Sequence, residues 1–219
     1  MAPRPPAPTR TERNPTKGEA RSSRELYHRL ASAPQGFEKG TSSHRPLGPP
    51  KGEAAVLVLF RLQHARSELL LIRRSDREGD PWSGHVAFPG GRREDSDGAL
   101  AATAVRETKE EVGISLEQLE GPPIPVGKRV PANRPWLHVG VFLSVLKDGE
   151  AAPLSLSPEV AEAFWTPLHE LRPSQGPVEV LGSEGHLRAE ALRFGDQVIW
   201  GFTRRVLLDV LGAYGPLLP

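Results

Sequence analysis

The sequence of 219 residues contains no cysteine. Disulfide bonds, thiol nucleophiles and thiolate metal sites are therefore excluded. Its histidines, seven in number, are scattered along the chain without the spacing of a ligand set. A metal bound by this protein would have to rely on oxygen ligands, which favours Mg²⁺ or Mn²⁺ over Zn²⁺.

Long apolar stretches and an excess of charge of one sign are also missing. No stretch approaches the run of about twenty apolar residues that a membrane-spanning helix needs, and the N-terminus lacks the apolar core of a secretory signal. The Arg-rich N-terminus has one trait of an organellar transit peptide, but Glu12, Glu19 and Glu25 argue against that assignment. The formal net charge of +1 gives no attraction toward nucleic acid or membrane surfaces. We expect a cytoplasmic protein with neither as a partner.

The composition predicts one folded domain with a polar N-terminal extension. Hydrophobic residues at 37% and charged residues at 25% suit a soluble globular protein, and the length allows a sizeable core. The segment before about Ser22 is rich in Pro, Arg, Thr and Ser, which is typical of disorder, and residues 36–52 read as a linker. We expect an extension over residues 1–52, with a short helix at 23–33 capped by Ser23, and a domain over residues 53–215.

Apolar periodicity in this domain alternates between strand and helix patterns. The expected strands are 55–62, 69–74, 85–88, 126–130, 136–146, 160–165, 187–194 and 197–200, and the expected helices are 98–112 and 202–211. The last two strands would form a hairpin that turns at Gly195 and Asp196. Mixed strands, hairpins and helices predict an α+β fold in which helices flank a sheet.

One helix carries a dense set of carboxylates. Glu107, Glu110 and Glu111 stand at helical offsets of zero, three and four, so they share one face. The opposite face would place a stripe on the core, formed by Ala101, Val105, Thr108 and Val112. Like charges at these spacings repel by about 0.2–0.5 kcal/mol per pair. A divalent cation would offset this repulsion, and Mg²⁺ prefers carboxylate oxygens and substrate phosphates.

The residues around this helix favour a metal site over a merely solvated acidic face. A strand-like run ends at Phe88 and leads through Pro89 into Gly90 and Gly91, where a backbone carbonyl can approach a metal closely. Gly113 follows the last carboxylate, where helices commonly end. Arg106 lies four residues before Glu110 and can orient its carboxylate by a charge-assisted hydrogen bond.

The segment from Arg106 to Ile114 resembles the box of the Nudix hydrolase family, written G-x5-E-x7-R-E-U-x-E-E-x-G-U with U apolar. Thr108 stands in for the first U. Counting back from Arg106, the box glutamate would fall on Gly98, so the loop is one residue longer than in the family pattern. Gly91 then matches the box glycine, and the acidic member is Glu94, Asp95 or Asp97.

Three further segments resemble the coenzyme A pyrophosphatase branch of this family: residues 70–75, residues 84–91 and residues 198–203. The chain departs from that pattern in four ways. The spacing from Arg74 to Gly84 is one residue too long, Ile72 replaces a threonine, His85 occupies a position where that branch usually carries glutamine, and Asp80-Pro81-Trp82 is inserted.

The resemblance implies a fold, a reaction and a set of site residues. The fold is an α/β/α sandwich with a mixed sheet, and the reaction is hydrolysis of a diphosphate that links a nucleoside to another group, X. Mg²⁺ or Mn²⁺ would be held by Glu107, Glu110, Glu111 and Gly91, with Arg106, Glu107 and Glu110 as catalytic residues. The general base is one of these glutamates or a later acid such as Glu159 or Glu162.

Several cations and aromatic side chains are candidates for substrate binding. Arg73 and Arg74 alternate on a strand, so only one of them can point toward the site, and Arg134 lies in a later loop. Lys128 and Arg129 are further cations, for which a surface role is the alternative. Trp82 and Trp136 follow prolines and can stack on a base, with core packing as the alternative, while Trp200 reads as core.

The leading substrate is coenzyme A or an acyl derivative, which would give 3′,5′-ADP and a phosphopantetheine. NADH, ADP-ribose and dinucleoside polyphosphates are alternatives with the same chemistry. A non-catalytic domain that binds a nucleotide is the alternative from another class. In each case the partner is a small nucleotide, and the protein is a monomer or a homodimer.

Overall fold

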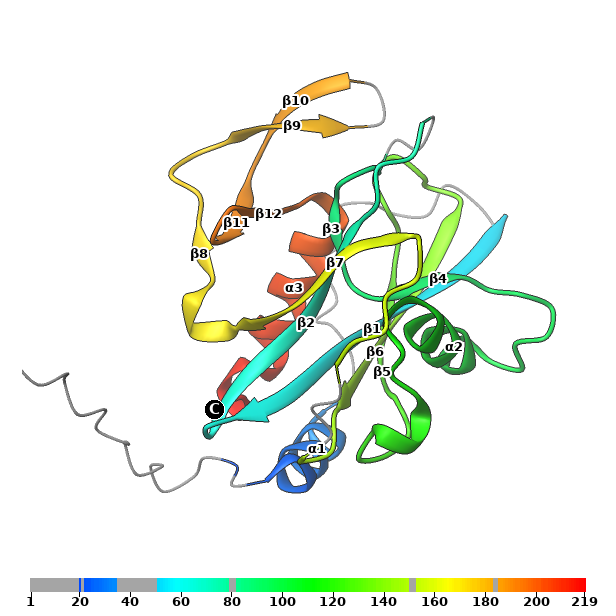
Figure 1. The fold of residues 1–219 in the computed structure, drawn as a ribbon, viewed down its shortest axis with the longest axis vertical. Coiled ribbons are helices and arrows are strands. Elements are labelled where there is room, and N and C mark those ends of the chain that lie inside the picture. The colour runs from blue at the N-terminus through cyan, green and yellow to red at the C-terminus, as the bar shows by residue number, and fades with distance from the viewer. Residues whose placement is uncertain (1–19, 21, 35–50, 79–81, 150–152, 183–184) are drawn as a thin grey trace, which may run out of the picture.

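The computed structural model describes residues 20, 22–34, 51–78, 82–149, 153–182 and 185–219 (Figure 1). Most of the segments that we expected to be a disordered tail and a linker lie outside the described residues. Among the described residues, no helix is long and apolar enough to cross a membrane. The α-helices are α1 (Ser23–Ser32), α2 (Leu100–Val112) and α3 (Gly201–Tyr214), and short 3-10 turns lie at Leu116–Gln118, Leu168–Glu170 and Gly215–Leu217.

A mixed seven-stranded sheet forms the centre of the molecule. Its strands are β1 (Gly52–Gln63), β2 (Arg66–Arg74), β3 (Val86–Ala87), β4 (Gly90–Arg92), β5 (Ile124–Arg129), β6 (Leu137–Val145) and β7 (Val160–Pro167). The order is β3-β2-β1-β6-β5, with β4 on β1 and β7 on β2. β1 runs antiparallel to β2 and parallel to β6, so the sheet is mixed as predicted.

Two small sheets lie beside the main one. They are formed by β8 (Arg172–Pro173), β9 (Val178–Gly182), β10 (Gly185–Ala189), β11 (Ala191–Phe194) and β12 (Gln197–Trp200). The predicted hairpin between β11 and β12 is confirmed. The single strand predicted over 187–194 is wrong, because the chain leaves strand geometry at Glu190 and β10 pairs back onto β9 instead.

Helices cover both faces of the main sheet (Figure 1). Successive residues of β1 point to opposite sides, so Leu57 packs toward α2 while Val58 packs toward α1 and α3. Each face therefore has its own apolar core. This arrangement confirms the α+β fold with helices on both faces of a mixed sheet.

Helix α1 belongs to one of these cores. Leu26 and Leu30 are fully buried, and the Tyr27 hydroxyl donates to the Pro122 carbonyl at 2.9 Å. The helix is capped by Ser22, whose Oγ accepts from the Glu25 amide, so the prediction of Ser23 as the cap is wrong by one residue. Ser23 is instead the first helical residue, and its Oγ donates to Asp148 at 2.6 Å. The segment that we assigned to an extension thus contributes to the apolar core.

A chain that starts at Gly52 is therefore expected to unfold at a lower temperature than one that starts at Ala20. The shorter chain loses Leu26 and Leu30, and full burial of such a side chain is worth about 1.5–3 kcal/mol. Thermal unfolding of the two truncations measures the difference. Equal unfolding temperatures and equal turnover would contradict this expectation and support a domain boundary at residue 53, which stays a prediction.

Candidate active site

The carboxylate helix α2 is rotated about its own axis relative to our prediction, so a different set of side chains is buried. The three glutamates do not share one environment: the side chains of Glu110 and Glu107 are 57% and 18% exposed, and Glu111 is 5% exposed. Ala101 and Val105 are only partly buried, so the predicted core stripe is wrong at these two positions. The buried residues of the helix are Thr103, Ala104, Thr108, Glu111 and Val112. As predicted, Gly113 ends the helix, in the left-handed conformation with a φ of 79°.

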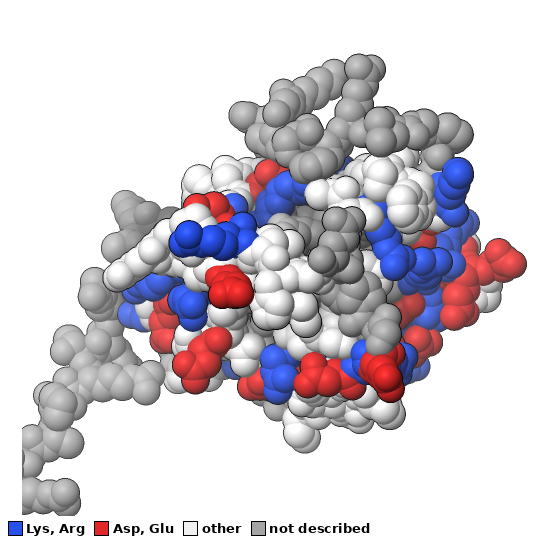
Figure 2. All heavy atoms as spheres, turned by 90° about the horizontal axis from the view of Figure 1, so that it is seen from above, with Lys and Arg blue, Asp and Glu red and all other residues white. Residues whose placement is uncertain are grey.

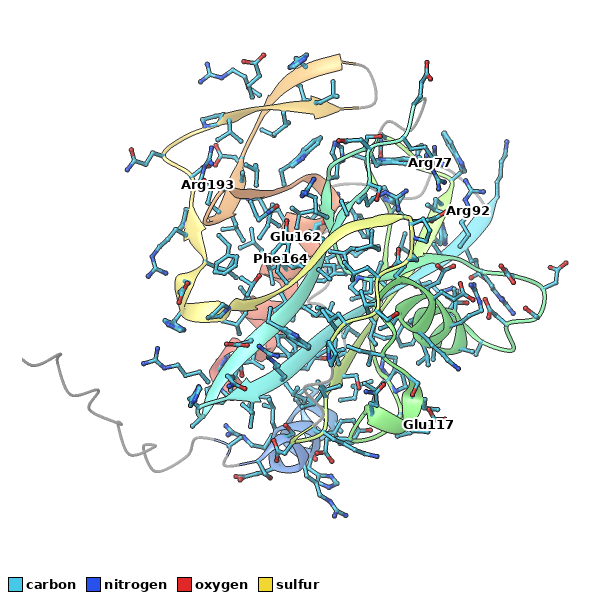
Figure 3. The ribbon with its side chains drawn as sticks, viewed as in Figure 1. Arg77, Arg92, Glu117, Glu162, Phe164 and Arg193 are labelled. Carbon is cyan, nitrogen blue, oxygen red and sulfur yellow. The ribbon has the colours of Figure 1, made fainter. Side chains whose placement is uncertain are left out.

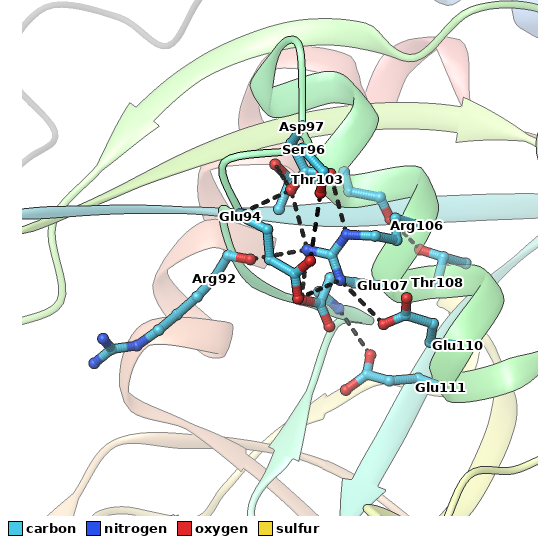
Figure 4. Close-up of polar contacts among 12 residues, drawn as sticks. Arg92, Glu94, Ser96, Asp97, Thr103, Arg106, Glu107, Thr108, Glu110 and Glu111 are labelled. Atoms are coloured by element: carbon cyan, nitrogen blue, oxygen red, sulfur yellow. Dashed lines mark hydrogen bonds and ion pairs between the residues drawn. The ribbon is translucent and has the colours of Figure 1, made fainter.

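Arg106 is the centre of the polar contacts in Figure 4. Its guanidinium contacts Glu110 at 3.0 Å and Glu107 at 3.1 Å, and it donates to the Arg92 carbonyl at 3.0 Å. Glu94 lies farther away at 3.8 Å. One side chain thus holds two of the three glutamates beside strand β4, as the spacing of Arg106 and Glu110 predicted.

Asp97 is the acid of the longer loop that the fold brings to Arg106. Its carboxylate accepts from Arg106 Nε at 3.1 Å, from Thr103 Oγ1 at 2.9 Å and from the Glu94 amide at 3.0 Å. Hydrogen bonds from Arg106, with further help from the Glu94 amide, hold the pKa of Asp97 well below its usual range. At 5% exposure, Asp97 is the buried anion that fixes Arg106, whereas Glu94 and Asp95 are exposed.

The Asp97→Asn variant is expected to have a lower turnover. It should also lack the stabilisation by Asp97, which varies with pH in the acid range. The pKa of an aspartate in the unfolded chain is about 3.9, and the pKa of native Asp97 lies lower. The stabilisation from Asp97 is therefore complete above that value and is lost as the pH falls toward the native pKa. Unfolding temperatures measured from pH 3 to pH 7 should differ most between the two proteins near neutrality. A difference that stays constant across this range would contradict the role of Asp97.

Glu111 is turned into the protein toward the glycine turn. Its Oε2 accepts from the Gly90 amide at 2.8 Å. Burial raises the pKa of Glu111 to about 8, although the Gly90 hydrogen bond and the charge of Arg74 act in the opposite direction. A carboxylate that remains this hard to ionise lacks enough positive charge around it.

Glu107 lies directly against Gly91. A Cβ atom added to Gly91 would come within 2.5 Å of both carboxylate oxygens of Glu107, so only glycine leaves room for this side chain. Burial, more than any other factor, raises the pKa of Glu107 above its usual value. Strand β4 and helix α2 therefore bring a backbone turn and two desolvated carboxylates together.

The donor set fits a hard divalent cation in its chemistry. Glu107 and Glu111, which contact the turn through Gly90 and Gly91, offer carboxylate oxygens, and a bound cation would supply the charge that Glu111 lacks. Within the described part of the chain, no group of three or more His, Asp or Glu side chains is already arranged so that it could hold a metal ion. Glu107 and Glu110 instead contact Arg106, and Glu111 contacts Gly90.

The two neighbouring arginines of β2 separate as strand alternation predicted. Arg73 pairs with Glu162 at 3.4 Å, and Gln197 Nε2 donates to the same Glu162 oxygen at 3.1 Å. Figure 3 shows Glu162 on β7, between β2 and the small sheets. Arg74 is the one whose charge acts on Glu111. The charge of one later acid, Glu159, also acts on Glu111, and Glu159 contacts Arg77 at 3.2 Å.

Trp82 and Arg134 meet although their loops are distant in the sequence. The Arg134 guanidinium carbon lies 4.0 Å from the centroid of a Trp82 ring. A cation on an aromatic face at this distance is attracted by the ring electrons. Trp136 is 45% exposed, and Trp200 is only half-buried, so the core assignment of Trp200 does not hold.

The remaining cations are engaged elsewhere. Arg129 forms a buried ion pair with Asp209 at 2.8 Å, and Lys128 contacts Glu53 at 3.0 Å. On the face seen in Figure 2, positive and negative side chains are interspersed rather than gathered in one basic stripe. Neither Lys128 nor Arg129 is brought to the carboxylate helix by these contacts.

Sequence reasoning missed one feature next to the site, namely the hairpin β9–β10 and its contact with His85. The imidazole Nε2 of His85 lies 2.6 Å from the Leu181 carbonyl oxygen. Gly182 and Gly185 flank the turn of this hairpin and were the available signal. No pattern in the sequence pairs position 85 with position 181, because that contact is set by tertiary structure.

Comparisons with known proteins agree with this geometry. Residues 50–181 match the model of the NUDIX domain. An uncharacterized protein of Schizosaccharomyces pombe is 40% identical over 146 residues, which are 58% of this chain and 44% of that protein. The NudL protein of Yersinia pestis, an uncharacterized Nudix hydrolase, is 33% identical over 157 residues, which are 70% of this chain and 75% of that protein.

A solved structure resembles the fold over most of the chain. A MutT/nudix family protein from Enterococcus faecalis superposes with a TM-score of 0.53 at 18% identity, covering 79% of this chain and 65% of that one. The residues that match the domain model include the glycine turn, Arg106 and all three glutamates. The chain spans less than half of the length of the first of these relatives, and its domain match shows that it belongs to the Nudix hydrolase family.

Proposed function

We propose that this protein hydrolyses the diphosphate bond of coenzyme A or an acyl derivative with Mg²⁺ or Mn²⁺, releasing 3′,5′-ADP and a phosphopantetheine. The observation that carries the reaction is the contact of Arg106 with both Glu107 and Glu110, together with the position of Glu107 against Gly91. The choice of coenzyme A rests on the resemblance of residues 70–75, 84–91 and 198–203 to one branch of the family. A cytoplasmic location is part of the same proposal.

Glu107, Glu110, Glu111 and the backbone carbonyl of Gly91 would hold the cation. When bound, the cation neutralises charge on the diphosphate oxygens and activates water for attack. Glu107 and Glu110 would exchange contacts with Arg106 for contacts with the cation. Arg106 stays in place during this exchange because the buried Asp97 holds it.

The attacking water must lose a proton to a carboxylate within hydrogen-bonding reach. Glu111 is too deeply buried for this task, and its oxygen is taken by the Gly90 amide. Glu107 is favoured over Glu110, because its side chain is the more buried of the two and lies against Gly91. Before the cation binds, Arg106 fixes the positions of both glutamates.

The substrate would lie across the site with its phosphates next to arginine side chains. Arg74 is close enough to influence Glu111, which supports a contact with the diphosphate, whereas Arg73 pairs with Glu162. The pair of Trp82 and Arg134 offers an aromatic ring and a cation, which suits the base and a phosphate of the nucleotide half.

The test is turnover of a substrate panel, separated by chromatography, with Mg²⁺ and then with Mn²⁺. The panel contains coenzyme A, acetyl-coenzyme A, NADH, ADP-ribose and diadenosine polyphosphates. Each substrate is also run with the Glu111→Gln variant. Preferential formation of 3′,5′-ADP that the variant abolishes is the expected result.

Two other results would overturn the proposal in different ways. Preferential turnover of NADH, ADP-ribose or a diadenosine polyphosphate would keep the reaction and reject coenzyme A. No turnover of any compound by a folded protein would favour a nucleotide-binding module without activity.

A further inference from the structure

The hairpin β9–β10 forms a two-stranded sheet that does not pair with the main sheet. It extends beyond β3 and β7 at the top of Figure 1. A two-stranded hairpin alone is marginally stable in water, so its position depends on contacts with the rest of the protein. These contacts therefore determine where the hairpin lies.

His85 provides one such contact. The Leu181 carbonyl can only accept a hydrogen bond, so the His85 Nε2 that lies 2.6 Å away must carry the proton and donate it. The imidazole also packs edge-on against Trp200, with ring centroids 4.9 Å apart. His85 thereby joins strand β9 to the residue that precedes helix α3.

The same histidine is built into the active site. Its backbone carbonyl accepts from the Arg74 amide at 3.0 Å, and Arg74 is the cation whose charge acts on Glu111. The chain then runs from His85 through β3 into the Gly90 and Gly91 turn. One short segment therefore carries both the anchor of the hairpin and the turn that contacts Glu107 and Glu111.

The two faces of the hairpin differ in character. One face carries the side chains of Glu179, Leu181, His186 and Arg188, all of them exposed. The other face is entirely apolar and more buried, and it carries Val178, Val180, Gly182, Gly185, Leu187 and Ala189. The apolar face is thus the less exposed of the two, and it is called the inward face.

Leu187 is the exception on the apolar face. It packs over Gly182, since its Cδ2 would lie 2.6 Å from a Cβ at that position, yet it remains 42% exposed. Val180, its cross-strand neighbour, is 8% exposed. An apolar side chain that faces inward but is left uncovered provides a surface for an apolar part of a ligand.

We infer that His85 is a positioning residue that anchors the β9–β10 hairpin to the segment leading into the Gly90 and Gly91 turn, and that the inward face of this hairpin at Leu187 binds the group X of the substrate. This inference rests on the proposed function and narrows it. X must be uncharged where it contacts the hairpin, because the inward face offers no charge. The nucleotide half is directed to Trp82 and Arg134 instead.

The first experiment compares Leu187→Ser with Leu181→Ser. Both leucines are exposed on the same hairpin, but only Leu187 is on the inward face. With coenzyme A as substrate, Leu187→Ser is expected to raise KM about tenfold with little change in kcat. Inhibition by 3′,5′-ADP, which lacks X, should stay as in the wild type. Leu181→Ser should behave as the wild type, because its outward side chain is lost while its backbone carbonyl remains.

The second experiment compares His85→Phe with His85→Gln. Phenylalanine keeps a ring against Trp200 but cannot donate to Leu181, whereas the glutamine amide can donate from a similar position. Amide hydrogen exchange in residues 178–189 is expected to be about three- to tenfold faster in His85→Phe, with a matching rise in KM for coenzyme A. His85→Gln should restore both.

A third measurement separates this inference from the proposed function. Hydrogen exchange of the wild type is followed in a chelator, where no metal supports turnover, with coenzyme A and with 3′,5′-ADP. Protection of residues 178–189 by coenzyme A alone supports the hairpin surface, even if the wild type turns over no compound of the panel. Equal protection by both ligands, or equal KM values for the two leucine variants in an active enzyme, overturns the inference and leaves the proposed function standing.

Discussion

The Glu111→Gln variant is expected to lose turnover and, in metal-free buffer, to gain stability at alkaline pH. Turnover should fall by about 10³-fold, because a carboxylate proposed to hold the cation becomes a neutral amide. The gain in stability follows from burial, since Glu111 is 5% exposed. A functional residue that costs stability is typical of active sites.

The sign of the pH effect follows from the raised pKa of Glu111. An unfolded glutamate titrates near about 4.3, whereas burial raises the pKa of native Glu111 to about 8. Between these values the native state holds a proton that the unfolded state has released. Wild-type stability therefore falls as the pH rises from about 4.3 to about 8, and the glutamine variant lacks this decrease.

Thermal unfolding in a chelator at pH 5, 7 and 9 measures this difference. The unfolding temperature of the variant should exceed that of the wild type most at pH 9. Adding Mg²⁺ at pH 9 should stabilise the wild type and leave the variant unchanged, because a ligand stabilises only the state that binds it. Glu110→Gln is the matched control for stability, since that side chain is 57% exposed. Parallel pH profiles for wild type and Glu111→Gln would contradict the prediction.

Alanine at Gly90 is expected to unfold the protein. A Cβ at Gly90 would lie 2.7 Å from the Val56 Cα in strand β1, and the Gly90 φ of 150° is rarely adopted by other residues. Backbone cannot move aside as a side chain can, so the cost is about 3 kcal/mol or more.

Alanine at the adjacent Gly91 is expected to inactivate the protein while leaving it folded. The new Cβ would meet the Glu107 carboxylate, which can swing away at little cost. The displaced carboxylate no longer reaches the site, and turnover should fall about 10²-fold. Urea unfolding and turnover, measured on both glycine variants, separate the two effects. A Gly91→Ala variant with full activity would show that Glu107 does not need its position beside the turn.

The chemistry of the site could be predicted from local sequence because it depends on one helix and one turn. The spacing of Arg106, Glu107 and Glu110 places three side chains on adjacent turns of any α-helix. The helix ends at Gly113, as expected, because glycine adopts the left-handed conformation there. The mixed sheet and its flanking helices likewise follow from apolar periodicity, which depends on neighbours along the chain.

Contacts between distant segments could not be predicted in this way. Three acids in the loop were candidates for the acidic member of the family's box. Only the path of the loop brings Asp97, nine residues before Arg106, into hydrogen bonds with it. The rotation of α2 was misjudged because buried hydrogen bonds, from Thr103 to Asp97 and from Gly90 to Glu111, turn polar side chains inward. The spacing of hydrophobic residues along the chain carries no information about such hydrogen bonds.

The sequence by itself determined the carboxylate helix, the glycine turn and the class of fold, because these depend on residues close together in the chain. Tertiary structure decided the pairing of Arg73 with Glu162, the burial of α1 and the anchoring of β9 by His85. Each of these depends on which surfaces meet after folding. Packing and desolvation act between segments far apart in the sequence, and no local pattern records their partners.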